Sequence, residues 1–116
     1  MDALISYVFF NYGDLMTPHE GLAYKSIIGK LKADHVHSPG ERELLLREWV
    51  SKDPEVLQLL EGDSEQFFVN VSQRILQEHP AEVFLNRCPR CDGLARTPYA
   101  KQCRHCFFSW HDDSEQ

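Results

Sequence analysis

All four cysteines of this chain fall within nineteen residues, and this clustering constrains its fold more than any other feature. They form two Cys-x2-Cys pairs, Cys88 with Cys91 and Cys103 with Cys106, separated by eleven residues. A Cys-x2-Cys pair can bend into a turn that presents two sulfurs to one ion, and two such turns complete a tetrahedral sulfur site. The spacing therefore predicts one metal centre that uses every cysteine.

Other uses of paired cysteines fit the sequence less well. Two disulfides would need an oxidising compartment, and the apolar stretch from Ala3 to Phe10 lacks the basic flank of an export signal. A thioredoxin-like pair needs a βαβ setting around a single motif, whereas both pairs lie in a segment interrupted by Gly and Pro. Soft thiolates in a tetrahedral site favour Zn2+, although iron takes the same four ligands. We expect one structural zinc ion.

The ligand set also argues against an enzyme. With sulfur at all four positions, the ion keeps no open site for water or substrate. His19-Glu20 begins like a metalloprotease motif, but Ala23 stands where the second histidine is needed. The chain contains no phosphate loop, dinucleotide fingerprint or nucleophile elbow. We therefore expect no catalytic residues.

Residues 84–111, about a quarter of the chain, resemble a zinc ribbon, in which two cysteine knuckles sit on short β-hairpins. The stretches 86–91, 94–98 and 102–104, together with Ala100, more narrowly resemble the ribbon tail of small, mostly uncharacterised bacterial proteins. This resemblance implies a metal site and a β-hairpin, and names no pathway. Glycine commonly follows the second cysteine of such a knuckle, but Asp92 and Phe107 stand there. Because a bulky side chain disfavours the left-handed conformation, we expect the second turn to be distorted or to differ.

The part of the chain before the cysteines is predicted to be helical. Apolar spacing predicts a helix over 2–12, and start signals at Thr17-Pro18, Ser38-Pro39, Asp53-Pro54 and Asp63-Ser64 predict four more. The second should run to about Ala33 and the last should stop at His79-Pro80. The second helix has one apolar stripe at helical spacing, formed by Tyr24, Ile27, Ile28 and Leu31. After Pro80, residues 83–85 are predicted to form a strand.

The expected fold class is therefore mainly α: a small irregular domain of about five short helices followed by a C-terminal β-hairpin zinc ribbon. The expected domains are an acidic helical domain over 1–80, the ribbon over 81–111 and a frayed acidic tail over 112–116. Residues 1–79 carry seven basic and thirteen acidic side chains, whereas 80–116 carry five of each. The net charge of -6 thus belongs to the helical part, and it suits a basic partner.

These observations lead us to expect a non-enzymatic, bacterial, cytoplasmic protein that acts by binding another protein. Its most specific version is an immunity or antitoxin-like inhibitor of a basic toxin. The alternative is a nucleic-acid-binding or regulatory protein, since Arg87, Arg90, Arg96, Lys101 and Arg104 lie in or beside the ribbon. A third possibility is a thiol redox or zinc sensor, because thiolates oxidise. We expect no membrane segment, and the oligomeric state stays open.

Overall fold

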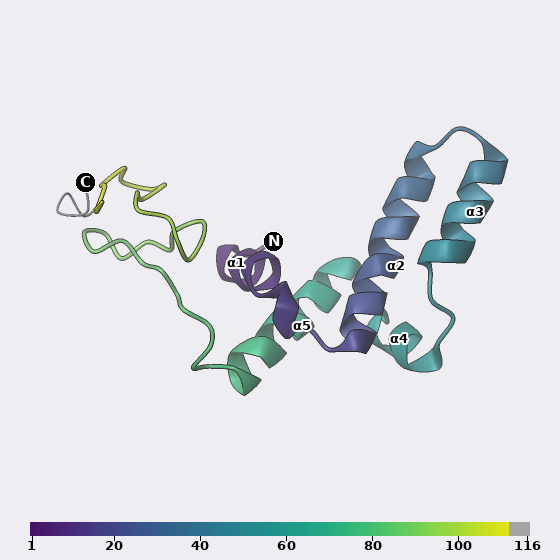
Figure 1. The fold of residues 1–116 in the computed structure, drawn as a ribbon, viewed down its shortest axis with the longest axis horizontal. Helices are drawn as coiled ribbons and strands as arrows, with labels where there is room; N and C mark the ends of the chain where they lie inside the picture. Colours follow the sequence, from purple (N-terminus) through teal and green to yellow (C-terminus); the bar gives the residue numbers. More distant parts are fainter. Residues whose placement is uncertain (112–116) are drawn as a thin grey trace. The chain divides into compact units, whose positions relative to one another are not determined.

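A computed structural model describes residues 1–111 of the chain (Figure 1). Its elements are α1 (Ala3–Asn11), the short 3-10 helix η1 (Gly13–Leu15), α2 (Pro18–His35), α3 (Pro39–Trp49), α4 (Pro54–Leu59) and α5 (Ser64–Glu78). The mainly α class predicted from the sequence is confirmed. The predicted frayed tail, 112–116, lies outside the described residues.

The helices begin where local hydrogen bonds complete their first turns. At the start of α2 the Glu20 N–H donates to Thr17 Oγ1 at 3.2 Å, and the Thr17 N–H donates to the Glu20 carboxylate at 2.9 Å. This reciprocal pair satisfies two amides that the helix itself leaves without acceptors. The side chains of Ser38, Asp53 and Asp63 accept backbone N–H groups at the later starts. The residues predicted from the sequence to begin these helices therefore make the expected capping hydrogen bonds.

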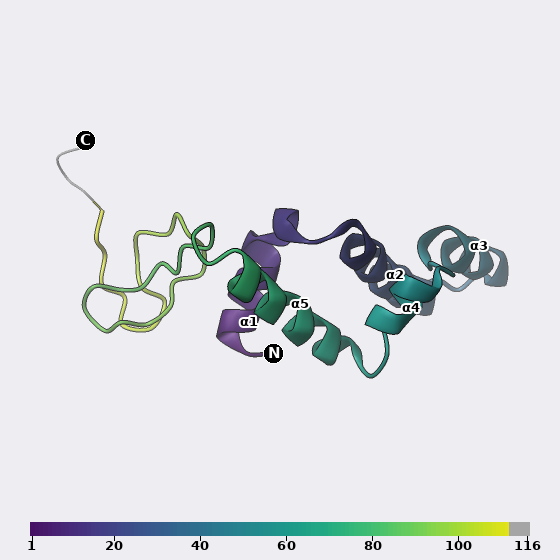
Figure 2. The same cartoon turned by 90° about the horizontal axis from the view of Figure 1, so that it is seen from below.

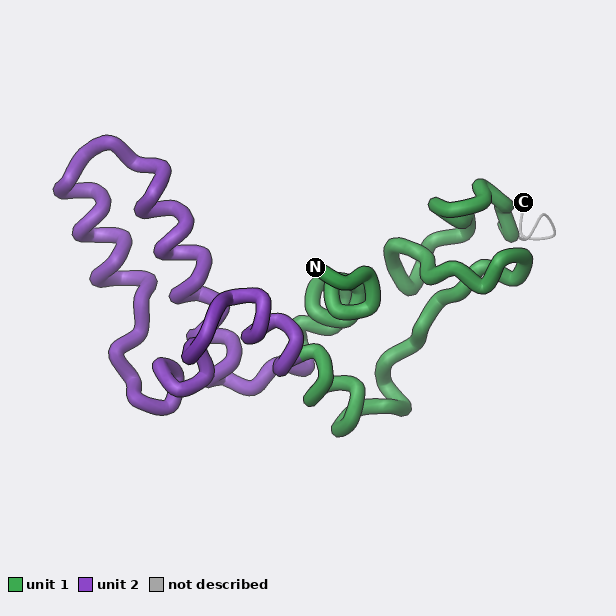
Figure 3. The backbone as a smooth tube through the Cα atoms, turned by 180° about the vertical axis from the view of Figure 1, so that it is seen from behind, with its two compact units in different colours: residues 1–14, 72–116 green, residues 15–71 purple. Residues whose placement is uncertain are grey.

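The described chain divides into two compact units, coloured separately in Figure 3. Unit 1 joins residues 1–14 to residues from 72 onward, and unit 2 contains residues 15–71. Unit 1 thus combines α1, the end of α5 and the cysteine-rich segment. The domain boundaries expected from the sequence lie near residues 80 and 111. They predict which segments fold independently, which a division by contacts does not test, so they stay a prediction.

In unit 2, α2 and α3 lie side by side and antiparallel (Figures 1 and 2). The buried face of α2 consists of small residues, Ala23, Ser26, Gly29 and Ala33, together with Glu20. Of the stripe predicted from apolar spacing, Tyr24, Ile27 and Ile28 are partly buried, whereas Leu31 is 53% exposed. Small side chains let another helix approach closely: a Cβ atom on Gly29 would lie 2.4 Å from the Cβ of Trp49 in α3.

In unit 1, two tyrosines of the N-terminal segment hold the chain that follows α5. The Tyr7 hydroxyl donates to the Phe84 carbonyl at 2.5 Å and accepts the Asn86 N–H at 3.2 Å. The Tyr12 hydroxyl accepts the Phe84 N–H at 2.9 Å. These backbone groups are therefore bound by side chains, and within residues 1–111 no strand pairs with them. The strand predicted over 83–85 is wrong for this reason.

The predicted C-terminal β-hairpin is also wrong, because no strand occurs within the described residues 81–111. Only two isolated antiparallel bridges are present there, Arg87 with Leu94 and Gln102 with Ser109. Between them, the Asn86 side-chain amide donates to the carbonyls of Thr97 and Ala100 at 2.9 and 2.8 Å. A side chain thus occupies carbonyls that an extended ladder would need.

Replacing Tyr7 with Phe is expected to lower the unfolding free energy of unit 1 by about 1–2 kcal/mol, because the buried Asn86 N–H loses its acceptor. Burial also raises the pKa of Tyr7 above its ordinary value of 10.0. The stability that the neutral hydroxyl contributes is therefore present below pH 10.0 and lost as the pH rises through the raised pKa. Denaturation followed by NMR at neutral and strongly alkaline pH should show the variant's deficit shrinking. Tyr99→Phe, at a residue that is 88% exposed, is the control and should leave the unfolding free energy unchanged at both pH values.

Candidate metal centre

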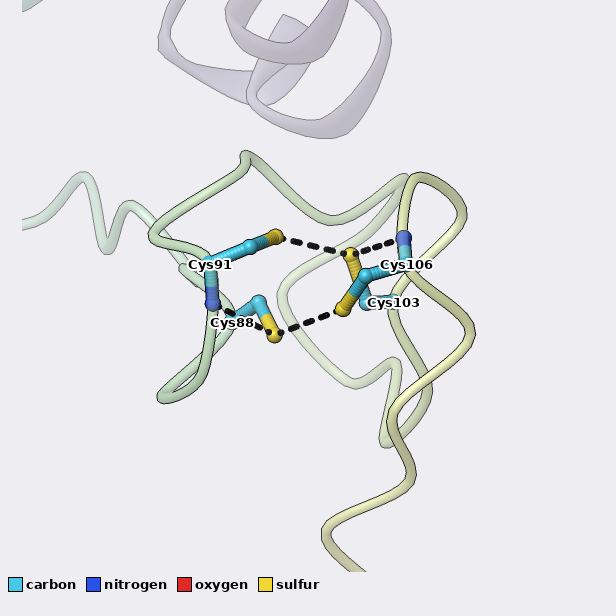
Figure 4. Close-up of side chains that lie close together, drawn as sticks. All are labelled: Cys88, Cys91, Cys103 and Cys106. Carbon is cyan, nitrogen blue, oxygen red and sulfur yellow. Dashed lines mark hydrogen bonds between the residues drawn. The ribbon is translucent and has the colours of Figure 1, made fainter.

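The four cysteine side chains converge from two loops, as Figure 4 shows. Their Sγ atoms all lie within 4.8 Å of one another. Cys88 Sγ is 3.7 Å from Cys106 Sγ, and Cys91 Sγ is 3.5 Å from Cys103 Sγ. A tetrahedral zinc ion with Zn–S bonds of ~2.3 Å places its sulfurs ~3.8 Å apart. None of the four is joined in a disulfide, so the arrangement predicted from the cysteine spacing can hold one metal ion.

Backbone amides support the first sulfur of each knuckle. Cys88 Sγ accepts the N–H groups of Arg90 and Cys91 at 3.3 and 3.4 Å. Cys103 Sγ accepts those of His105 and Cys106 at 3.2 and 3.4 Å. Hydrogen bonds to sulfur favour the charged thiolate, which is the form that binds a metal.

The thiols influence one another's ionisation. The N–H of Cys106 lowers the pKa of Cys103 to about 6, and the His105 N–H and neighbouring thiols act in the same direction against burial. At Cys91 the Gly93 N–H also favours the thiolate, but hydrogen bonds with the other thiols and burial outweigh it and raise the pKa to about 12. Neighbouring sulfurs therefore resist ionising together, and a bound cation is what makes four thiolates stable.

The two knuckles are structural copies offset by fifteen residues. Cys88 N–H donates to Gly93 O at 2.9 Å, and Cys103 N–H donates to Phe108 O at 2.8 Å. The outer bonds, Ala95 N–H to Asn86 O and Trp110 N–H to Lys101 O, are both 2.8 Å long. Both isolated bridges also follow this offset. Sequence inspection missed the repeat because residues 86–95 and 101–110 share only their cysteines.

The position after each second cysteine is left-handed in both copies. Asp92 has a φ of 62° and Phe107 a φ of 65°, so the expectation of a distorted or different second turn is wrong. Phenylalanine adopts this conformation only against a steric cost of about 1–2 kcal/mol. Its side chain is 72% exposed and gains little burial in return.

Phe107→Gly is therefore expected to stabilise the metal-bound knuckle by about 1 kcal/mol, since glycine adopts a positive φ without this cost. Slower hydrogen exchange at residues 103–108 would measure the gain. Asp92→Gly is the matched control and should change stability less, because aspartate already tolerates the conformation. A loss of stability at Phe107→Gly would mean that the aromatic ring supports the turn.

The five cations of the alternative nucleic-acid prediction have different surroundings. Arg87 Nη1 donates to the Asp92 carbonyl at 3.3 Å, and the Arg90 guanidinium lies 5.9 Å from the Phe108 ring centroid. Lys101 is exposed. Arg96 and Arg104 line one hollow beside α1. This pairing was not predictable from local sequence patterns, because α1 lies more than eighty residues away along the chain. A role in nucleic-acid binding stays a prediction.

Comparison with known proteins adds no relative: no family model, no curated protein and no solved structure matches the chain. Of the zinc-ribbon resemblance, the structure supports one part: a cluster of four cysteines that could bind a metal ion. Among the described helices, none combines the length and apolar character needed to cross a membrane.

Proposed function

We propose that the protein binds one structural Zn2+ ion through Cys88, Cys91, Cys103 and Cys106, and that it acts without catalysis by binding another protein. The observation that carries the proposal is the arrangement of four sulfurs at tetrahedral spacing. A zinc ion with four sulfur ligands has no free position for a substrate, which favours a structural role. The bound ion would stabilise the folded state of the cysteine-rich segment, residues 86–110.

Metal analysis of protein prepared from its native host tests the first part. We expect one zinc per chain in the wild type and a loss of that zinc in Cys88→Ser. Ser109→Ala, outside the ligand set, is the control and should keep the metal. Iron accepts the same four sulfur ligands, so it is the alternative occupant of this site. One equivalent of iron in place of zinc would contradict the proposal.

The surface of unit 2 supports the second part. Unit 2 contains ten acidic and six basic side chains, a net charge of -4. It also leaves four leucines, Leu22, Leu31, Leu44 and Leu57, between 43% and 53% exposed. No residue of α3 is buried. Apolar side chains set among carboxylates suit a basic partner that offers apolar contacts, and charge complementarity speeds its association.

A tagged pull-down from the native host, after nuclease treatment, tests this binding. We expect a stoichiometric basic protein that is retained less well at high salt, and inhibition of a basic toxin is the specific version that we favour. Leu44→Glu in α3 should weaken its capture, whereas Phe84→Ser in unit 1 should not. Capture that disappears with nuclease would instead favour the nucleic-acid alternative, and a sample without any stoichiometric protein would contradict the proposal.

A further inference from the structure

A hollow of about 440 Å³ in unit 1 has no assigned role. Ser6, Phe10 and Asn11 of α1 form part of one wall, and Arg96, Thr97 and Arg104 form part of the other. Its volume falls in the range of pockets that take small organic molecules. The hollow is separate from the four sulfurs, although Arg104 directly follows Cys103 in the chain.

The charge of this hollow is opposite to that of the chain as a whole. Its lining residues include two arginines and no aspartate or glutamate, whereas the chain carries 18 acidic against 12 basic residues. Among residues 1–111, neither Arg96 nor Arg104 forms an ion pair. Two unneutralised cations facing one space attract an anion.

Arg104 supplies a second, independent observation. Its Nε is buried and has no hydrogen-bond partner among the described residues. A buried donor without an acceptor is costly, so such atoms in folded proteins usually have a partner. A guanidinium presents parallel donors that match the two oxygens of a carboxylate or phosphate. Because Nε itself is closed to solvent, an oxyanion in the hollow would accept from the Nη groups of the same guanidinium, which donate to no group among the described residues.

The backbone on both sides of the hollow is held in place. Asn11 Nδ2 donates to the Arg96 carbonyl at 3.3 Å, which ties this arginine to α1. The Asn86 amide holds the Thr97 carbonyl at 2.9 Å. Arg104 lies within the second knuckle, between a cysteine and a residue whose N–H contacts that cysteine's sulfur. A site whose backbone is fixed before binding loses less conformational entropy when the ligand arrives.

We propose that this hollow binds a small organic oxyanion, with its phosphate or carboxylate group against Arg96 and Arg104 and its apolar body against Phe10. The Phe10 side chain is 60% exposed at the hollow and is available for such a contact. Ser6 and Thr97 add hydroxyl groups that can donate to an oxygen. The ligand class follows from two cationic donors at one side and an aromatic surface at the other.

Titration of the zinc-loaded full chain with phenyl phosphate and with benzoate, by calorimetry and NMR, tests the proposal. We expect saturable binding with amide shifts at Ser6, Asn11 and Thr97, and the tighter probe identifies the anionic group. Arg96→Gln and Arg104→Gln should each weaken binding about tenfold or more. Arg87→Gln is the matched control, because Arg87 donates to a carbonyl of the first knuckle, and it should change binding less than about twofold.

Phe10→Ser separates the apolar contact from the charge: it should weaken phenyl phosphate and leave inorganic phosphate unchanged. Each variant is checked for one bound zinc and for wild-type chemical shifts elsewhere in unit 1. If Arg104→Gln does not fold, the binding affinity of Arg96→Gln alone tests the proposal. No saturable binding of either probe would overturn the proposal. So would equal weakening by Arg87→Gln, since binding would then reflect general charge. Neither result depends on whether a protein partner exists.

Discussion

Removing the metal ion with a chelator is expected to unfold residues 86–110 and to leave the helices of unit 2 folded. Within this segment the buried residues are few: Asn86, Cys88, Leu94, Ala95 and Cys103. Two of these are proposed metal ligands and one is polar, so the segment lacks an apolar core of its own. Binding of structural zinc contributes on the order of 10 kcal/mol to such small sites. Without it, the two isolated bridges and the hydrogen bonds that Tyr7, Asn11 and Asn86 make in this segment are too few to hold the turns.

NMR and circular dichroism on the same sample measure this effect. Amide signals of residues 86–110 should collapse toward random-coil positions, while the helical signal of α2 to α4 persists. Cys106→Ser should behave as the chelated wild type does, and Ser109→Ala should behave as the metal-bound protein. Dispersed signals that survive complete metal removal would show that contacts other than the metal hold the segment.

Gly29→Ala is expected to destabilise unit 2 by about 3 kcal/mol, because it overpacks the contact between α2 and α3. The new Cβ would lie 2.4 Å from the Trp49 Cβ and 3.5 Å from its Cα. Neither atom is the free end of a flexible side chain, so α3 itself must shift. The shift would also disturb the Lys32 ammonium, which lies 3.9 Å from the Trp49 ring centroid.

Gly21→Ala, in the same helix, is the matched control for this prediction. A Cβ there meets nothing within 4 Å, so the variant should gain up to about 1 kcal/mol from the better helix propensity of alanine. Thermal and urea unfolding measure the change in unfolding free energy, which should be a loss for Gly29→Ala and a gain for Gly21→Ala. A stabilised Gly29→Ala would mean that α3 moves away from α2 without cost.

Local chemistry explains which parts of the fold were predictable from the sequence. Thr17, Ser38 and Asp53 each lie within a few residues of the amides that they cap, so a short window of sequence contains the whole interaction. The cysteine cluster was predictable for a related reason, since the ligand spacing within each knuckle is local. The buried face of α2 was not, because Gly29 and Ser26 are buried by what packs on them and carry no apolar signal of their own.

The errors in the cysteine-rich segment have a common cause in distant contacts. Residues 83–85 have the composition of a strand, yet the backbone N–H and carbonyl of Phe84 bond to tyrosine hydroxyls more than seventy positions earlier, and the Val83 N–H donates to the His79 carbonyl. The hollow beside α1 escaped notice in the same way, because Arg96 and Arg104 meet Phe10 only in the folded chain. A pattern read along the sequence does not report such pairings.

The division of unit 1 between the two ends of the described chain has a consequence for synthesis on the ribosome. Tyr7 is made 77 residues before Phe84, its hydrogen-bond partner, a delay of roughly 4–15 s at typical elongation rates. Unit 2 lies wholly within this interval and can fold while the nascent chain lengthens. Until the second half of unit 1 emerges, the apolar side of α1, with Ile5, Val8 and Phe9, has no partner from that unit. During this window α1 is the segment that a chaperone would be expected to hold.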